Sequence, residues 1–276
     1  MDRSSRLFCL AAGITAAALP VLLSAPGHLS RSAKAPLFGR NYAHRGLHTP
    51  DRSVPENSLA AFAAAAELGY GVELDVQLSK DGKVVVFHDD DLKRVCGVDA
   101  RVDEKTLEEL QSLHLCGTEE TVPLFSSVLD VIHGRGPIIC ELKTGRRNRE
   151  LCRKTLDLIR SYQGEICIES FDPTIVAWFR FHAPDLVRGQ LAAPAEEYKG
   201  KGKLLSFVLS RCLLNVIARP QFIAYKIGPR PLIVHLCEVM GAMKVGWTSH
   251  SPKNEKGRHI VIFEFYRPAL RFRELK

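Results

Sequence analysis

Short apolar segments alternate along most of this chain with longer segments whose apolar residues recur at helical spacing. The short segments have the length and β-branched content of buried strands, and they lie near residues 41, 71, 137, 165, 187, 221, 244 and 259. Helices are predicted over 58–68, 123–133, 149–162, 173–182, 203–218 and 232–240. Repeated strand–helix units predict an α/β fold, a (β/α)₈ TIM barrel. A doubly wound open sheet is the alternative, but no strand is followed by GxGxxG or GxxxxGK[ST].

Two departures from the regular alternation follow the second strand. Residues 73–78 and 83–88 are joined by Lys80-Asp81-Gly82, which is too short for a parallel crossover and predicts an antiparallel hairpin. Pairing outward from this turn brings His88 opposite Leu74 and Asp75. Residues 90–122 are polar and irregular, with one short helix predicted over 104–113, and we expect them to form a small insertion.

Polar side chains collect at the predicted strand ends. These residues are His44, Glu73, Asp75, Glu141, Lys143 and Ser170. In a barrel of parallel strands, the C-terminal ends meet at one rim, where catalytic residues gather. The pattern therefore predicts an active site built from several strands.

Three acids in this set are candidate metal ligands. Glu73 and Asp75 alternate along one apolar strand, so both project from the same face, roughly 7 Å apart. Buried carboxylates are costly without a nearby positive charge. Glu141 and Lys143 share one face of another strand, and an ion pair between them is the competing interpretation. Oxygen donors without clustered Cys or His favour Mg²⁺ or Ca²⁺ over zinc.

Two histidines have a catalytic context. His44 and His88 each end an apolar strand, and Arg45 follows the first of them. The other histidines are expected to be surface or core residues: His28, His48, His114, His133, His182, His235, His250 and His259.

Composition narrows the function further. The chain has 276 residues, 46% of them hydrophobic, and a formal charge of +7. The basic balance permits nucleic acid, an anionic membrane or a phosphorylated substrate as partner. No nucleic-acid module is present, so nucleic acid is the weakest of these possibilities. The eight cysteines form no CxxC pair and are expected to be free, buried and in a reducing compartment.

The N-terminus carries an apolar run over residues 7–25, which is about long enough to span a bilayer. We expect residues 1–25 to be a membrane anchor, with a cleaved signal sequence as the alternative. Residues 26–39 are then a linker and residues 40–276 the barrel domain. The flanking basic residues favour a single-pass membrane protein with a cytoplasmic catalytic domain; secretion after cleavage is the alternative.

An ordered set of motifs resembles the glycerophosphodiester phosphodiesterase family. These motifs are His44-Arg45-Gly46, Pro55-Glu56-Asn57-Ser58, Glu73-Leu74-Asp75-Val76, Asp81-Gly82, His88-Asp89, Glu141-Leu142-Lys143, Ser170-Phe171 and Trp247-Thr248. The resemblance covers roughly residues 40–268. The segment after Trp247-Thr248 departs from the family pattern, because it is too short for a full last helix.

The resemblance implies a TIM barrel with a small insertion and a divalent metal held by Glu73, Asp75 and Glu141. It further implies His44 and His88 as the general acid/base pair, with Arg45 and Lys143 as phosphate contacts. The implied reaction is hydrolysis of a glycerophosphodiester to glycerol 3-phosphate and an alcohol. Two alternatives stay open: a phospholipase D-like lyase that forms a cyclic phosphate, and a catalytically silent, membrane-anchored phosphodiester-binding protein.

Overall fold

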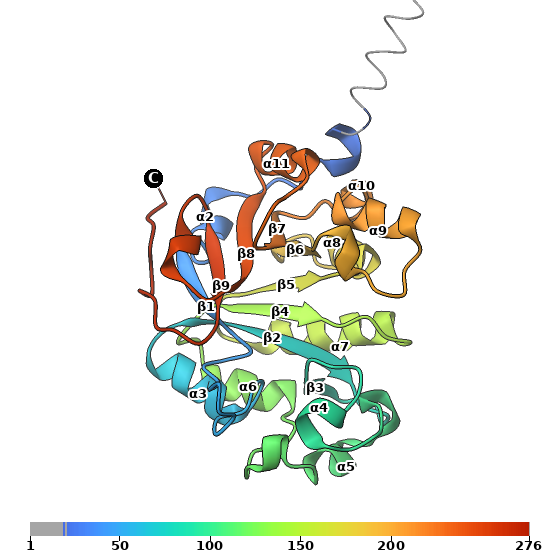
Figure 1. Cartoon of the computed structure of the whole chain (residues 1–276), viewed down its shortest axis with the longest axis vertical. Helices are drawn as coiled ribbons and strands as arrows, with labels where there is room; N and C mark the ends of the chain where they lie inside the picture. Colours follow the sequence, from blue (N-terminus) through green and yellow to red (C-terminus); the bar gives the residue numbers. More distant parts are fainter. Residues whose placement is uncertain (1–18, 20, 276) are drawn as a thin grey trace, which may run out of the picture.

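A closed barrel of parallel strands forms the body of the computed structural model, which describes residues 19 and 21–275 (Figure 1). The barrel strands are β1 (Arg40–His44), β2 (Gly71–Leu78), β4 (Ile138–Leu142), β5 (Ile166–Ser170), β6 (Arg188–Ala192), β7 (Phe222–Lys226), β8 (Met243–Ser249) and β9 (Ile260–Phe263). They pair in the order β1-β9-β8-β7-β6-β5-β4-β2, and a parallel pairing of β1 with β2 closes the ring. The eight predicted strands and the barrel are confirmed, and the open sheet is excluded.

The strand register brings the polar strand ends together. Asp75 of β2 pairs with Glu141 of β4, which in turn pairs with Glu169 of β5. His44 of β1 pairs with Glu73. Because paired residues of parallel strands share a face, these side chains point to the same side of the barrel wall.

The predicted hairpin is also confirmed. β3 (Val84–Val86) lies antiparallel to β2, with Val76 paired to Val86. Gly82 has a φ of +74°, which a residue without a side chain adopts without strain in such a turn. The strand leads directly into His88.

Helices follow most barrel strands and cover the outside of the barrel. They are α3 (Leu59–Glu67), α6 (Phe125–Ile132), α7 (Asn148–Ser161), α8 (Pro173–His182), α9 (Lys203–Ser210), α10 (Asn215–Ala218) and α11 (Leu232–Val239). The helix predicted over 203–218 is two helices, separated where Cys212 has a φ of 54°. Between β8 and β9 a single 3₁₀ turn, η4 (Pro252–Glu255), replaces a full helix.

The insertion over 90–122 packs beside the hairpin and has a small hydrophobic cluster of its own. It contains α4 (Lys93–Cys96), η1 (Val102–Glu104), α5 (Leu107–Gln111) and η2 (Leu115–Gly117). The predicted helix over 104–113 is shorter, because Thr106 accepts from the backbone of Glu109 and caps α5 there. Buried side chains such as Leu110 join it to Val85 of the hairpin.

Residues 26–39, expected to be a linker, pack against the barrel instead. They include α2 (Arg31–Lys34), which Ser30 caps. Leu37 and Phe38 are buried in one cluster with Phe222 and Met243, at the N-terminal end of the strands. The physical reason is that both side chains are apolar, and packing them against the end of the barrel removes their surface from water.

The predicted anchor or signal sequence lies mostly outside the described residues and stays a prediction. Within residues 19 and 21–275, no helix is both long and apolar enough to span a bilayer. Of the seven cysteines in this part of the chain, all are free and five are buried, as expected for small hydrophobic residues.

Substitution of Gly189 in β6 tests how tightly the barrel interior is packed. A Cβ at this position would lie 1.9 Å from the Phe222 ring, so Gly189→Ala should destabilise the fold by about 1–3 kcal/mol. Urea denaturation measures this change. Gly145→Ala is the matched control, because its Cβ would meet nothing within 4 Å and should shift stability by less than ~0.5 kcal/mol. Equal effects of the two substitutions would contradict this packing.

Candidate active site

Three carboxylates meet at the C-terminal rim of the barrel. Glu73 and Asp75 of β2 and Glu141 of β4 each place one oxygen within 4.8 Å of the others. Their exposed fractions are 3%, 0% and 6%. The structure thus brings together the three residues that the sequence singled out as metal ligands.

Burial and mutual repulsion set the charge of this cluster. Burial and the neighbouring Asp75 carboxylate raise the pKa of Glu73 well above its usual range. Burial also raises the pKa of Glu141, although Lys143 opposes this shift. For Asp75 the effect of burial is outweighed by His88, Lys143 and Arg45, which lower its pKa. Asp75 therefore carries the most firmly held negative charge of the three.

Lys143 and Arg45 provide the buried positive charge beside the acids. The Lys143 ammonium lies 3.0 Å from Glu141 Oε1 and 3.4 Å from Asp75 Oδ1. Burial acts to lower the Lys143 pKa, but attraction to Glu141 and Asp75 raises it. Arg45 Nε lies 3.6 Å from Asp75 Oδ2, and the Arg45 backbone N–H donates to Glu73 Oε2 at 3.2 Å. Both cations thus lie beside Asp75, each near a different oxygen of its carboxylate.

A tight left-handed turn after β1 positions Arg45. Arg45 and Gly46 have φ values of 53° and 80°. Gly46 also packs so closely on Ala61 that a Cβ would lie 2.8 Å from it. Glycine is therefore required at position 46 on both counts.

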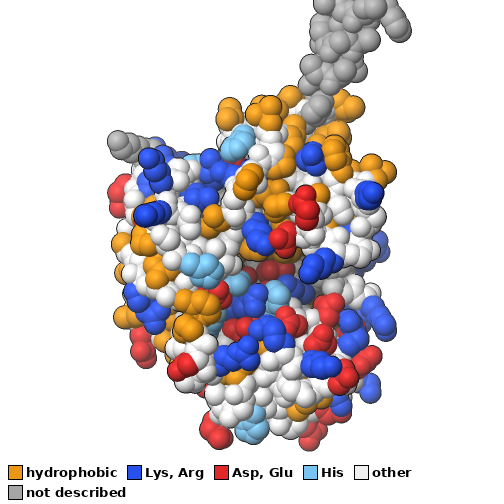
Figure 2. Space-filling model, viewed as in Figure 1, with side chains coloured by type: hydrophobic (Ala, Val, Ile, Leu, Met, Phe, Trp, Pro, Cys, Tyr) orange, Lys and Arg blue, Asp and Glu red, His pale blue; other side chains and the backbone are white. Residues whose placement is uncertain are grey.

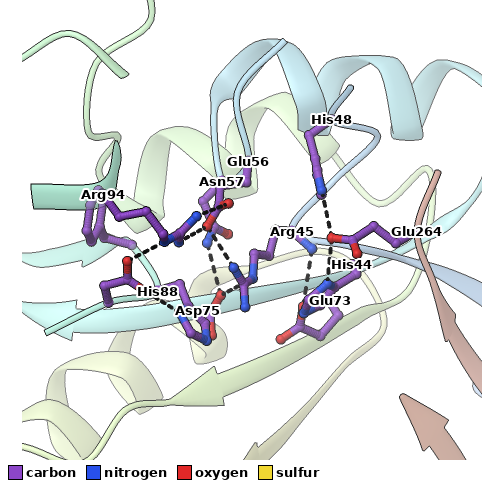
Figure 3. Close-up of polar contacts among 12 residues, drawn as sticks. His44, Arg45, His48, Glu56, Asn57, Glu73, Asp75, His88, Arg94 and Glu264 are labelled. Carbon is purple, nitrogen blue, oxygen red and sulfur yellow. Dashed lines mark hydrogen bonds and ion pairs between the residues drawn. The ribbon is translucent and has the colours of Figure 1, made fainter. Parts of the chain in front are cut away.

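Glu56 and Asn57 hold this turn from the loop before α3 (Figure 3). Asn57 donates to Asp75 Oδ2 at 2.9 Å, and Arg45 donates to Glu56 Oε1 at 2.7 Å. Arg94 of the insertion donates to both oxygens of Glu56 and to Asp89. Burial alone would raise the Glu56 pKa, but Arg94 and Arg45 lower it to about 2. These roles were not assigned from the sequence, although Glu56 and Asn57 belong to a motif noted there.

His44 stands on one side of the acids and is held by Glu264, which follows β9. Its Nδ1 lies 3.2 Å from Glu264 Oε1 and its Nε2 lies 3.9 Å from Glu73 Oε2. His48 Nε2 contacts the same Glu264 oxygen at 2.9 Å. Burial lowers the pKa of His44, and Glu264 partly offsets this. Sequence analysis missed Glu264 and treated His48 as an ordinary surface or core residue, because their partners lie about 220 residues away.

His88 stands on the other side of the acids, next to Asp75 (Figure 3). Its Nδ1 lies 2.6 Å from Asp89 Oδ1, and its side chain is 31% exposed. Each histidine therefore has one ring nitrogen bound to a carboxylate. Such a contact fixes the ring orientation and leaves the second ring nitrogen outside that contact.

Glu169 is a fourth buried acid that the sequence analysis did not identify. It is 1% exposed, and its Oε2 has no hydrogen-bond partner. Burial and the nearby Glu141 raise its pKa well above the usual range. Ser170, noted at the same strand end, has a structural contact instead: its hydroxyl donates to the Leu142 carbonyl at 2.7 Å.

An open pocket of about 620 Å³ begins at Glu141 and Lys143. Its volume is typical of small-molecule sites. One wall is apolar and consists of Phe171, Tyr198, Leu205, Leu209, Leu214 and Trp247. Lys199 and Lys201 line another part. One end of the pocket thus carries charged side chains of both signs, and the rest has room for an apolar group of a ligand.

The donor set fits a hard divalent cation. The three acids offer oxygen ligands, and buried Asp75 Oδ1 accepts no hydrogen bond, although the Lys143 ammonium lies 3.4 Å from it. The three carboxyl groups of the cluster have two cationic side chains beside them, Lys143 and Arg45. Oxygen-only coordination suits Mg²⁺ or Ca²⁺.

Comparisons with known proteins agree with this geometry. A sequence profile of the glycerophosphoryl diester phosphodiesterase family matches residues 44–259. A glycerophosphodiester phosphodiesterase of Caldanaerobacter subterraneus is 35% identical over 161 residues, which are 54% of this chain and 65% of that protein. A rat protein named lysophospholipase D GDPD1 is 31% identical over 159 residues, 52% of this chain and 48% of its own length. The alignments thus span less than two thirds of each relative.

Solved structures share the fold. A phosphodiesterase from Oleispira antarctica, in complex with the product sn-glycerol-3-phosphate, superposes with a TM-score of 0.66 and 22% identity, covering 82% of this chain and 93% of that one. A glycerophosphodiester phosphodiesterase from Thermotoga maritima gives a TM-score of 0.61 and 27% identity over 81% and 93%.

Glu264 should determine the protonation of the two histidines it contacts. Its carboxylate opposes the burial that lowers the pKa of His44 and His48. Glu264→Gln removes this charge, so both pKa values should fall further, as measured by NMR titration of metal-free protein. His88, which Asp89 contacts instead, is the internal control. Unchanged His44 titration would show that Glu264 does not interact with it in solution.

Proposed function

Because the chain belongs to the glycerophosphoryl diester phosphodiesterase family, we propose that it hydrolyses a glycerophosphodiester to glycerol 3-phosphate and an alcohol. The observation that carries this proposal is the cluster of Glu73, Asp75 and Glu141 with a histidine on each side. The activity named for the Caldanaerobacter relative supports the same reaction.

Glu73, Asp75 and Glu141 would hold a divalent cation, Mg²⁺ or Ca²⁺. When bound, such an ion neutralises charge on the phosphoryl oxygens and on the oxyanion that develops during attack. Arg45 and Lys143 border the same cluster and are suited to bind the remaining phosphate oxygens. This arrangement addresses the main obstacle to hydrolysis, which is the negative charge of the diester.

His44 and His88 are the proposed general acid/base pair. Each has one nitrogen bound to a carboxylate, Glu264 or Asp89, and they approach the acid cluster from opposite sides. One imidazole would accept a proton from the attacking water, while the other would donate a proton to the leaving alcohol oxygen. The water oxygen would form a new bond to phosphorus as the bond to the alcohol oxygen breaks, and the two proton transfers avoid release of an alkoxide.

A lysophospholipid is a second candidate substrate. The apolar pocket wall, which includes Phe171, Leu209 and Trp247, starts beside Lys143 and could contact an acyl chain. The name of the rat relative, lysophospholipase D, supports the same substrate class.

A substrate panel tests the reaction itself. We expect glycerol 3-phosphate release from at least one glycerophosphodiester, and its loss on addition of chelator. Lysophosphatidylcholine in the same panel tests the second candidate through release of choline. Phosphorus NMR identifies the product, and a persistent cyclic phosphate would replace the hydrolase proposal with the lyase. Binding without turnover of any substrate would favour the silent binding protein.

Removal of one carboxylate should strongly weaken metal binding. Loss of groups that only orient a metal ligand costs roughly 10–100-fold in affinity, so Glu73→Gln or Asp75→Asn should cost more than roughly 100-fold. Calorimetric titration with Mg²⁺ and Ca²⁺ measures this, in parallel with turnover. The control is Asp130→Asn, an exposed acid on α6. Full activity in excess chelator would rule out the metal-dependent mechanism.

His88→Ala should separate proton transfer from metal binding. We expect kcat to fall by about 10²–10⁴-fold, the usual contribution of a general acid or base, while metal affinity is retained. His114→Ala, an exposed histidine of the insertion, should leave kcat unchanged. If His88→Ala instead loses the metal, His88 is a ligand and not an acid/base group.

A further inference from the structure

The helix α9 exposes more of its large apolar side chains than it buries. Its buried face holds Ser206, Leu209 and Ser210, whereas Leu204 is 78% exposed and Phe207 45% exposed. A helix on the outside of a water-soluble barrel normally places its apolar stripe toward the core. The outward face of α9 is therefore suited to an apolar environment.

The neighbouring elements extend this apolar surface. Most large apolar side chains exposed among the described residues lie on α9–α11 and at residues 19, 21 and 22. We name the part on the helices the docking face, which comprises Leu204, Leu205 and Phe207 of α9, Ile217 of α10, and Leu232 and Val239 of α11. Figure 2 shows hydrophobic side chains gathered at the top of the molecule, where Figure 1 places these helices.

Hydrogen bonds attach the end of the N-terminal apolar run to α10 and to the residue that follows this helix. Asn215 of α10 donates to the carbonyl of Ser24 at 3.0 Å and to Cys237 of α11 at 3.4 Å. Arg219 donates to the carbonyls of Leu22 and Ala25 at 3.2 and 2.9 Å. Residues 21–25, the end of this apolar run that the structure describes, therefore lie against α10, beside the docking face.

Basic residues flank α9 without partners of opposite charge. Lys199, Lys201 and Lys203 are exposed, and no carboxylate of residues 19 and 21–275 lies within ion-pair distance of them. Of the two acids that directly precede these lysines in the chain, Glu197 is paired with Lys226, whereas Glu196 has no ion pair among the described residues. Basic residues beside an apolar helix face are typical of proteins that bind anionic lipid surfaces.

We propose that the docking face binds an anionic lipid bilayer and places the pocket at the lipid surface. Leu205 and Leu209 of α9 line the pocket together with Lys199 and Lys201. A bilayer in contact with α9 would thus lie at the pocket entrance. A substrate with an acyl chain could then reach Glu141 and Lys143 without crossing open water.

Position-resolved fluorescence tests this orientation. Residues 7–25 could hold the chain to vesicles unaided, so binding alone is not informative. Leu204→Trp in the full chain reports contact through quenching by brominated acyl chains, in vesicles of phosphatidylcholine and phosphatidylglycerol. Leu68→Trp is the matched control, since Leu68 is a 52% exposed leucine at the end of α3, on the opposite side of the barrel (Figure 1). Wild-type protein gives the background of Trp178 and Trp247.

We expect quenching at position 204 and none at position 68, with weaker quenching on vesicles of phosphatidylcholine alone. Equal quenching at both positions, or none at position 204 on vesicles that carry the chain, would overturn the proposal. So would a lipid-free dimer that Leu204→Asp converts to monomers, because a second copy would then cover the docking face.

A kinetic comparison adds a readout that rests on the proposed function. Leu204→Asp with Phe207→Asp should lower turnover of vesicle-embedded lysophosphatidylcholine by roughly tenfold or more, the effect of withdrawing one large apolar side chain from lipid. Turnover of water-soluble glycerophosphocholine should be unchanged, because neither residue lines the pocket. Equal losses on both substrates would contradict membrane docking. If neither substrate reacts, the proposed function fails, whereas the fluorescence result still decides the docking face.

Discussion

Repulsion among buried carboxylates is the constraint on which this structure depends. Glu73, Asp75 and Glu141 converge at the barrel rim, and Glu169 is buried next to Glu141. Lys143 and Arg45 provide the buried positive charge at this point, which does not balance the acids. Repulsion in such a cluster is relieved when carboxyl groups bind protons, as the raised pKa values of Glu73 and Glu169 favour, or when a further cation enters, and a rigid scaffold holds the groups in place. The closed barrel provides the scaffold, and the oxygen donors suit the cation.

The surrounding network orients the groups that we propose to act on a substrate. Glu264, which follows the last strand, contacts His44, whereas Asp89, which follows the hairpin, contacts His88. Arg94 joins the insertion to Glu56, and Glu56 in turn holds Arg45. The insertion is therefore part of the active site's support. The abbreviated segment between β8 and β9 leaves this support intact, because Glu264 follows β9 directly.

The outer surface divides into regions of different chemistry. The rim around the acids is charged, whereas the wall formed by α9, α10 and α11 exposes leucine, phenylalanine and valine side chains. The pocket lies between them and shares Leu205 and Leu209 with α9. The helix α9 thus contributes both to the pocket and to the proposed lipid contact. This arrangement would relate substrate access to the membrane surface.

The sequence by itself determined the strand–helix order, the hairpin and the rim position of Glu73, Asp75, Glu141, Lys143 and His44. These features follow from local periodicity and from turn residues such as Gly82, which act over a few residues. It did not determine the roles of Glu264, His48 and Arg94, the burial of Glu169 or the packing of residues 26–39. It also did not show which face of α9 is exposed. Those features depend on partners far away in the chain, and only closure of the barrel brings such partners within hydrogen-bond distance.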